Sequence, residues 1–128
     1  MEAAGDKRVD LDWKCGELAE GLECYRRGEF FLAHEHWEIV WLRSNEPEKS
    51  FLQALIQMSS ACHHRQRGNL KGAASLMSKS LQRLGMCSPF LGGIAVAELC
   101  MEVREWLRLL QGGEPGTSWT CPLITVLE

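Results

Sequence analysis

The 128-residue sequence has no long apolar run and no excess of positive charge. No stretch approaches the roughly 18 apolar residues of a membrane-spanning helix, so we expect no membrane segment. The first twelve residues mix acids and bases and do not resemble a secretory signal peptide. The net charge of −3 and the pI near 5.8 do not favour a nucleic-acid partner. We therefore expect a small molecule or a protein as partner. The sequence does not indicate the oligomeric state.

None of the six cysteines forms a C-x-x-C pair, which argues against zinc ribbons and thioredoxin-like chemistry. Cys15, Cys62 and Cys100 fall at apolar positions of predicted helices. We therefore expect reduced, mostly buried thiols in a cytoplasmic protein. An apolar content of 45% and a charged content of 24% are typical of a globular domain, and the length suits one domain spanning 1–128.

Helical periodicity runs through nearly the whole chain and predicts an all-α protein. Five helices are expected, followed by an extended segment over 117–128 that has no strand to pair with. Turns are predicted at Gly28, at Ser44–Pro47, at Gly68 and over Gly85–Gly93. The predicted helices cover about 12–27, 29–43, 47–67, 69–84 and 94–111.

Residues 28–33 align with residues 68–73 at an offset of 40 positions, because both stretches carry glycine first and alanine last. Each unit is therefore a helix, a glycine turn and a second helix, which resembles tetratricopeptide architecture. The offset exceeds that repeat's length of about 34 residues, and only two units exist, so no solenoid is expected. The predicted fold is a compact bundle of two helical hairpins plus a C-terminal helix.

Polar side chains cluster on the second and third predicted helices. His34 and Glu38 share one helical face because they are four residues apart, and Trp41 follows one turn later. On the third helix a polar stripe contains Gln53, Gln57, Ser60 and His64. A short loop makes the two helices antiparallel, so we expect His34 and His64 at the same end and Glu38 opposite Gln57 or Ser60.

This cluster allows two interpretations. In the first, it is a buried hydrogen-bond network, or the lining of a pocket, in a small binding or scaffold module without a cofactor. In the second, His34, Glu38 and His64 bind a divalent metal in an enzyme, perhaps a hydrolase, with Glu35 as its base. His36 and His63 are predicted to point to other faces, and the tryptophans Trp37, Trp41 and Trp106 are predicted to lie in the core.

Two linked motifs, G-E-F-F-L-A-H-E-H-W-E-I-V-W over 28–41 and F-L-Q-A-L-I-Q-M-S-S-A-C-H-H-R-Q-R-G-N-L-K-G-A over 51–73, give the chain a resemblance to a known family. The sequence resembles domain-of-unknown-function family 309 over roughly residues 18–84. The resemblance implies a small all-helical domain and no established activity. The signature positions that it implies are His34, Glu35, Glu38, Trp41, Gln53, Gln57, His64, Gly68, Asn69, Gly72 and Ala73. The chain departs from the pattern at His36, Trp37, Ala54 and His63, which leaves His34, Glu38 and His64 intact.

Overall fold

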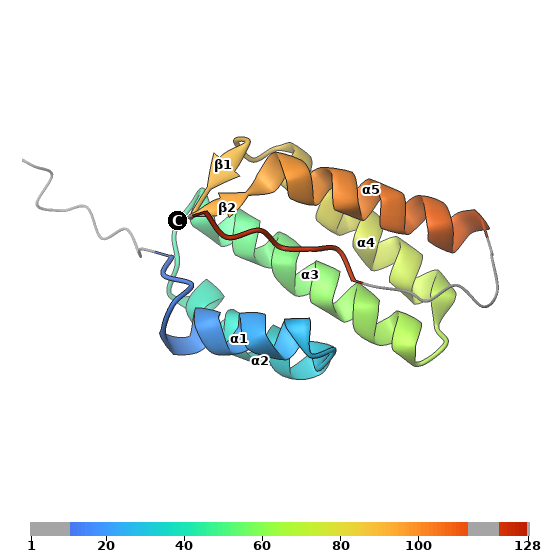
Figure 1. Ribbon diagram of the computed structural model, residues 1–128, viewed down its shortest axis with the longest axis horizontal. Helices are drawn as coiled ribbons and strands as arrows, with labels where there is room; N and C mark the ends of the chain where they lie inside the picture. Colours follow the sequence, from blue (N-terminus) through green and yellow to red (C-terminus); the bar gives the residue numbers. More distant parts are fainter. Residues whose placement is uncertain (1–10, 113–120, 128) are drawn as a thin grey trace, which may run out of the picture.

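A computed structural model describes residues 11–112 and 121–127 of the chain. It contains five α-helices and a two-stranded hairpin, and this confirms the predicted all-α fold. The elements are α1 (Gly16–Arg26), α2 (Phe30–Leu42), α3 (Glu48–Gln66), α4 (Leu70–Gly85), β1 (Phe90–Leu91), β2 (Ile94–Ala95) and α5 (Val96–Gly112). Helix α3 runs through the middle, with α1 and α2 on one side and α4 and α5 on the other (Figure 1). Each helix packs against the next one along the chain.

The two helical hairpins turn in the same way, as the 40-residue echo predicts. Gly28 and Gly68 both have positive φ, of 82° and 80°, a conformation that glycine adopts without steric cost. In each turn the residue after the glycine donates its N–H to the carbonyl five residues back, at 2.8 Å, from Glu29 to Cys24 and from Asn69 to His64. The two glycines therefore end α1 and α3 by equivalent capping motifs.

Alanines lie at the helix interfaces that follow these turns. Ala33 and Ala73 are completely buried at the start of α2 and α4, where a small side chain allows neighbouring helices to approach.

Two buried serines form hydrogen bonds between neighbouring helices. Ser59 of α3 donates to the Phe30 carbonyl at 2.6 Å, and Ser80 of α4 donates to the Ala54 carbonyl at 2.7 Å. These bonds satisfy hydroxyl groups that burial would otherwise penalise.

The first helix begins at Gly16, four residues later than predicted. The Asp12 carboxylate accepts hydrogen bonds from the Lys14 N–H at 2.9 Å and from the Cys15 thiol at 3.2 Å, which holds residues 12–15 in a turn. Cys15 is extended and exposed. Its predicted place on the apolar stripe is therefore wrong, because the side chain of Asp12 competes with the helix for backbone N–H groups.

The prediction of an unpaired C-terminal segment is also wrong for its described part. Gly92 and Gly93 both have positive φ, and they form a two-residue turn between β1 and β2. The edge of β2 then pairs with the segment at 121–127. Ile94 bridges Val126, and the Leu127 N–H donates to the Gly93 carbonyl at 2.7 Å. The remaining predicted tail residues, 117–120 and 128, lie outside the described residues.

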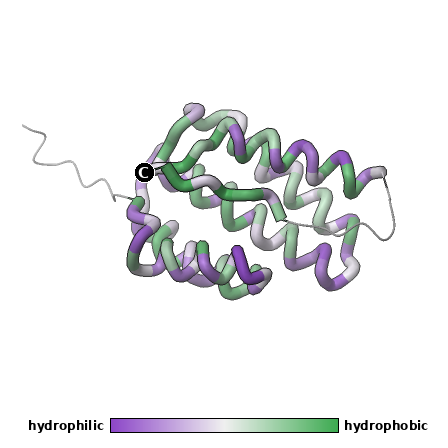
Figure 2. The backbone as a smooth tube through the Cα atoms, in the orientation of Figure 1, coloured by the Kyte–Doolittle hydropathy of each residue, from purple (hydrophilic) through white to green (hydrophobic). Residues whose placement is uncertain are grey.

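The core is one cluster that includes side chains from all five helices and from the C-terminal segment. Trp37 is completely buried, and its indole N–H donates to the Leu18 carbonyl at 3.3 Å. Trp106 is buried on α5, whereas Trp41 is only half-buried, with the Lys49 ammonium 4.6 Å from its ring centre. The C-terminal segment presents hydrophobic residues as it crosses the bundle (Figure 2). It covers the region between α1 and α5 (Figure 1).

Candidate functional site

The predicted pair of His34 and Glu38 lies on the outer edge of the interface between α2 and α3. His34 Nε2 is 3.7 Å from Glu38 Oε2, and the two side chains are 25% and 51% exposed. Among the described residues, His34 is the polar side chain that contacts Glu38. The expected hydrogen bond from Glu38 to the polar stripe of α3 is therefore wrong, because Ala33, Trp37 and Val40 occupy the buried face of α2 and leave Glu38 at its margin.

The α3 stripe is half-buried at Gln53, Gln57 and His64. Ser59, one position before the predicted Ser60, is the serine that bonds across to α2. Two buried atoms, His34 Nδ1 and Gln57 Oε1, have no hydrogen-bond partner within the described part of the chain. Glu35 is exposed, so it does not face the interior with the other signature residues.

His63 lies beside His34, not on another face as predicted. The Phe31 ring lies between them, with ring centres 5.7 Å from His34 and 5.8 Å from His63. Burial lowers the pKa of His63, and the nearby Arg67, His64 and His34 lower it further. Three histidines and a phenylalanine thus form one aromatic group at the end of the α2–α3 pair.

His64 and Asn69 meet at the turn between α3 and α4. The Asn69 amide nitrogen is 3.2 Å from His64 Nδ1, while the Asn69 amide oxygen accepts the Gly72 N–H at 3.0 Å. The second contact caps α4, as the sequence predicts for Asn69. A side chain at Gly72 would clash with the Asn69 amide, which gives a structural reason for glycine there. These signature positions are therefore explained by the turn itself.

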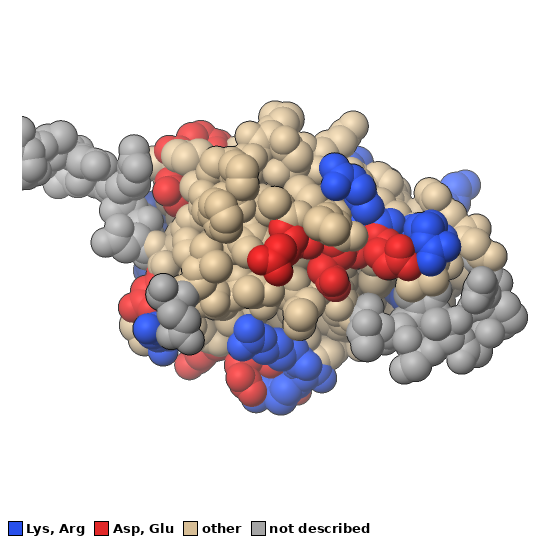
Figure 3. Space-filling model, turned by 45° about the horizontal axis from the view of Figure 1, so that its top comes forward, with Lys and Arg blue, Asp and Glu red and all other residues tan. Residues whose placement is uncertain are grey.

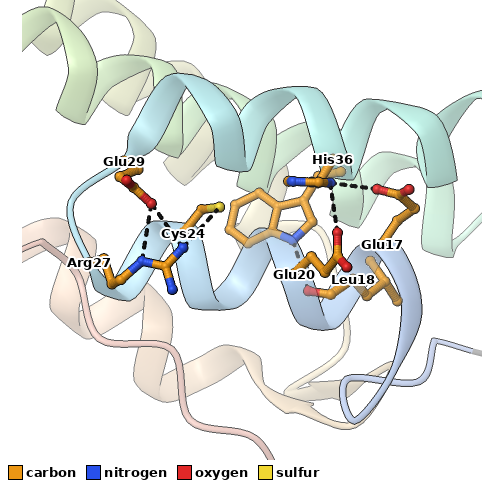
Figure 4. A network of polar contacts seen from close by, with 8 residues as sticks. Glu17, Leu18, Glu20, Cys24, Arg27, Glu29 and His36 are labelled. Carbon is orange, nitrogen blue, oxygen red and sulfur yellow. Dashed lines mark hydrogen bonds and ion pairs between the residues drawn. The ribbon is translucent and has the colours of Figure 1, made fainter.

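A different cluster brings metal-ligand atoms together. Glu17, Glu20 and His36 each place one ligand atom within 4.8 Å of the others, and among the described residues this is the group that does so. His34, Glu38 and His64 do not form such a group in the described part of the chain. His36 Nδ1 is 2.5 Å from Glu17 Oε2 and 3.6 Å from Glu20 Oε2 (Figure 4). His36, predicted to be peripheral, therefore joins α2 to α1.

The spacing of the sequence around Gly28 contains a signal for this contact. Glu20 and His36 are equally distant from the turn glycine Gly28, so an antiparallel hairpin brings them together. Glu17 follows because it lies one turn before Glu20. Two carboxylate oxygens and one imidazole nitrogen suit Zn²⁺ or Mn²⁺. The same three groups also form an ion pair between α1 and α2 when His36 is protonated.

An apolar concavity with converging polar groups lies elsewhere, where the C-terminal segment crosses the α1–α2 turn and the end of α3. This cavity has a volume of about 430 Å³. We call it the segment cavity. It is lined by Tyr25, Arg26, Arg27, Gly28, Phe30, Cys62, Arg65, Gln66, Trp106, Cys121, Pro122, Leu123 and Ile124.

Hydrogen bonds hold the segment over this cavity. The buried Tyr25 hydroxyl donates to the Pro122 carbonyl at 2.6 Å, and Arg26 Nη2 donates to the Ile124 carbonyl at 3.3 Å. Burial raises the pKa of Tyr25 well above its usual range, so this hydroxyl keeps its proton and remains a donor. The segment is thus part of the cavity wall.

Three guanidinium groups line the segment cavity. Arg27 contacts Glu29 at 2.9 Å (Figure 4). It also lies 3.6 Å from Glu23, so its charge is partly balanced. Burial lowers the pKa of Arg65, which sits beside Cys62 and Cys121 and keeps its charge at neutral pH. The predicted cluster contributes no side chain to this cavity. No local pattern in the sequence marks these three arginines as a site, because residues 121–124 of the distant C-terminal segment complete the cavity.

The fold and these sites define a small all-α domain built on helical hairpins, and comparison with known sequences confirms the resemblance stated above. The sequence model of the family described as "Domain of unknown function (DUF309)" matches residues 18–76, from α1 into α4. An uncharacterized protein from Aquifex aeolicus (strain VF5) is 30% identical over 99 residues. That match covers 77% of this chain and 30% of the relative, so the chain spans about a third of the relative's length. The function of the family is not established by these matches.

No helix among residues 11–112 and 121–127 combines the length and apolar character needed to cross a membrane. On the face that Figure 3 shows, Lys and Arg side chains are interspersed with Asp and Glu side chains.

Proposed function

We propose that this domain is a small binding module and that the segment cavity binds a small organic anion with an apolar portion. The observation that carries the proposal is the cavity itself, in which Arg26, Arg27 and Arg65 adjoin the aromatic walls of Tyr25, Phe30 and Trp106. A volume of about 430 Å³ lies within the range of small-ligand sites, roughly 300–1,000 Å³.

Each part of the lining supports one part of the ligand. The guanidinium groups favour a carboxylate or phosphate because arginine donates paired N–H groups in one plane. The aromatic and aliphatic walls favour a flat or branched apolar portion. In this proposal, the cluster at His34, Glu38, Gln57 and His64 is architectural. Of its side chains, His64 contacts Asn69 at the turn between α3 and α4, and His34 and Glu38 contact each other along α2.

The test compares phenylacetate with its uncharged analogue phenylacetamide by isothermal titration calorimetry on the full chain. We expect measurable binding of phenylacetate only. Arg65→Gln should weaken it by about tenfold or more, because a hydrogen bond to a charged group contributes roughly 1.5–3 kcal/mol. Arg43→Gln is the control, since Arg43 is exposed and does not line the cavity. Equal binding of acid and amide, or equal loss in both variants, contradicts the proposal.

A metal-dependent activity is the second candidate. The convergence of Glu17, Glu20 and His36 favours this cluster as the metal site over the predicted ligands His34, Glu38 and His64, with Glu35 as base. Thermal melts with and without Zn²⁺ or Mn²⁺ separate the two sets. A metal-induced rise in melting temperature that Glu17→Gln abolishes and Glu38→Gln preserves supports the first set. The reverse result supports the second, and no shift in any variant excludes both. A cytoplasmic location remains a prediction that rests on the cysteine pattern.

A further inference from the structure

Two cysteines from distant parts of the chain meet at the wall of the segment cavity. Cys62 lies near the end of α3 and is 3% exposed, whereas Cys121 begins the described C-terminal segment and is half-buried. Both line the cavity, and they lie close enough for each thiol to shift the pKa of the other. All six cysteines are free thiols in this structure, so the pair is in its reduced form.

The surroundings fix the two chain segments that carry these cysteines. The bond from the Tyr25 hydroxyl to the carbonyl of Pro122 fixes the residue directly after Cys121. The pairing of Val126 with Ile94 fixes the other end of the segment. Cys62 is fixed by α3. Contacts on both sides of Cys121, together with helix α3 around Cys62, therefore hold the two cysteines in place before any reaction.

The two thiols are chemically unequal. The hydrogen bond from the Cys62 thiol lowers the pKa of Cys121, and the Arg65 guanidinium lowers it further, against the opposing effect of burial. The same hydrogen bond and burial raise the pKa of Cys62 well above its usual range. By contrast, burial raises the pKa of Cys87 and Cys100. A thiol with stabilised thiolate character beside a protonated partner is the arrangement of a reactive cysteine and its resolving cysteine.

We propose that Cys62 and Cys121 form a reversible, peroxide-driven disulfide that ties the C-terminal segment to α3 at the edge of the segment cavity. This proposal goes beyond the proposed binding function and does not depend on it, because it rests on the placement of the two thiols alone.

The chemistry needs only hydrogen peroxide as oxidant. The Cys121 thiolate attacks one peroxide oxygen, the O–O bond breaks, and the departing hydroxide takes up the proton lost by Cys121 to become water. Cys121 is then a sulfenic acid. The Cys62 sulfur attacks the Cys121 sulfur, the S–O bond breaks, and the Cys62 proton leaves with the hydroxide as a second water. Two thiols are oxidised by two electrons, and a small dithiol such as dithiothreitol reverses the reaction.

The experiment treats the reduced full-length chain with hydrogen peroxide and maps its disulfides by mass spectrometry of peptides kept under non-reducing conditions. We expect a Cys62–Cys121 cross-linked peptide, a fall from six to four alkylatable thiols, and full recovery of six after dithiothreitol. Cys15→Ser is the matched control. Cys15 is exposed and does not line the cavity, so this variant should give the same cross-link.

Two further variants test the assigned roles. Cys121→Ser should remove the cross-link and leave Cys62 unoxidised over the same time. Cys62→Ser should leave Cys121 as a sulfenic acid that dimedone traps. Because Cys62 is buried and its variant is the one more prone to misfold, the assignment relies on wild type and Cys121→Ser. The same treatment in urea should lose the selectivity.

The proposal is overturned if the folded protein forms a different disulfide first, such as Cys87–Cys100, or if Cys15 is oxidised while Cys62 and Cys121 remain free. It is also overturned if the Cys62–Cys121 cross-link forms equally well in urea, because the folded arrangement would then contribute nothing.

Discussion

The contact between Gly21 and Trp37 sets how closely α1 approaches α2. A Cβ atom at Gly21 would lie 3.0 Å from Trp37 Cε2 and closer still to the indole nitrogen. Trp37 cannot move aside easily because it is completely buried and packs edge-on against Trp13, with ring centres 6.4 Å apart. The close approach of α1 to α2 therefore requires a residue without a side chain at position 21.

Gly21→Ala should lower the free energy of unfolding by about 1–3 kcal/mol, the usual cost of overpacking a core. Urea unfolding followed by circular dichroism measures it. Gly85→Ala is the control, because a Cβ at Gly85 meets nothing within 4 Å and alanine favours the helix. If Gly21→Ala is as stable as Gly85→Ala, the indole is not fixed in the position described.

His63 gives the protein a pH dependence of defined sign. Its pKa is lowered in the folded state by burial first and then by Arg67, His64 and His34. In the unfolded chain His63 has its ordinary pKa of about 6.5. Below that pH the unfolded state binds a proton that the folded state does not, so stability falls as the pH drops from about 7 through the unfolded pKa.

The measurement compares wild type with His63→Gln by urea unfolding between pH 7.5 and 5.5. The loss of stability on acidification should be smaller in His63→Gln than in wild type. Histidines common to both proteins, including His36 beside Glu17, contribute equally and cancel. An identical pH dependence in the two proteins would show that His63 titrates in the folded state as it does in the unfolded one.

At the scale of elements, the sequence predicts the helices well because their signals are local. The glycine turns at Gly28 and Gly68, the cap at Asn69 and the apolar spacing each act within a few residues. The predictions are wrong where contacts between residues far apart in the sequence determine the local structure. The small hairpin around Gly92 and Gly93 creates an edge for residues 121–127, and no local pattern shows that edge.

The candidate site is less predictable for the same reason. Periodicity places His34 and Glu38 on one face, which the structure bears out, but it cannot show that Ala33 and Trp37 exclude Glu38 from the interface. Cys62 and Cys121 are 59 positions apart, and only the path of the C-terminal segment brings them together. The segment cavity depends on that path as well.

The Tyr25 hydroxyl is the main buried polar anchor of the C-terminal segment, so Tyr25→Phe tests how firmly the segment is held. The change leaves the Pro122 carbonyl without its donor in a buried position. We expect a loss of about 1–3 kcal/mol in the free energy of unfolding. Faster amide hydrogen exchange should appear in residues 121–127.

Arg26→Gln provides the comparison, because Arg26 donates to the same segment at 3.3 Å from an exposed position. Its effect on stability should be within about 0.5 kcal/mol, as for most surface substitutions. A larger effect from Arg26→Gln than from Tyr25→Phe would mean that the exposed contact holds the segment and the buried one does not.

For the whole molecule, the decisive feature is that α3 packs against both α2 and α4 and that one core cluster includes side chains from every helix. Phe51, Leu52, Leu55 and Met58 of α3 are completely buried. Neither the α1–α2 hairpin nor the α4–α5 pair can keep its apolar face covered if α3 unfolds. The layers should therefore lose structure together, as small domains with a shared core do.

Far-UV circular dichroism and tryptophan fluorescence should give coincident urea transitions, since the first reports all helices and the second includes the buried Trp37 and Trp106 of opposite layers. Leu55→Ala should shift both midpoints equally and cost about 2–5 kcal/mol. Hydrogen exchange separates the layers directly. Near the transition midpoint, peptides from α2 and α5 should exchange with the same free energy. If α1 and α2 open at lower urea than α4 and α5, the hairpins unfold independently and α3 does not unite them.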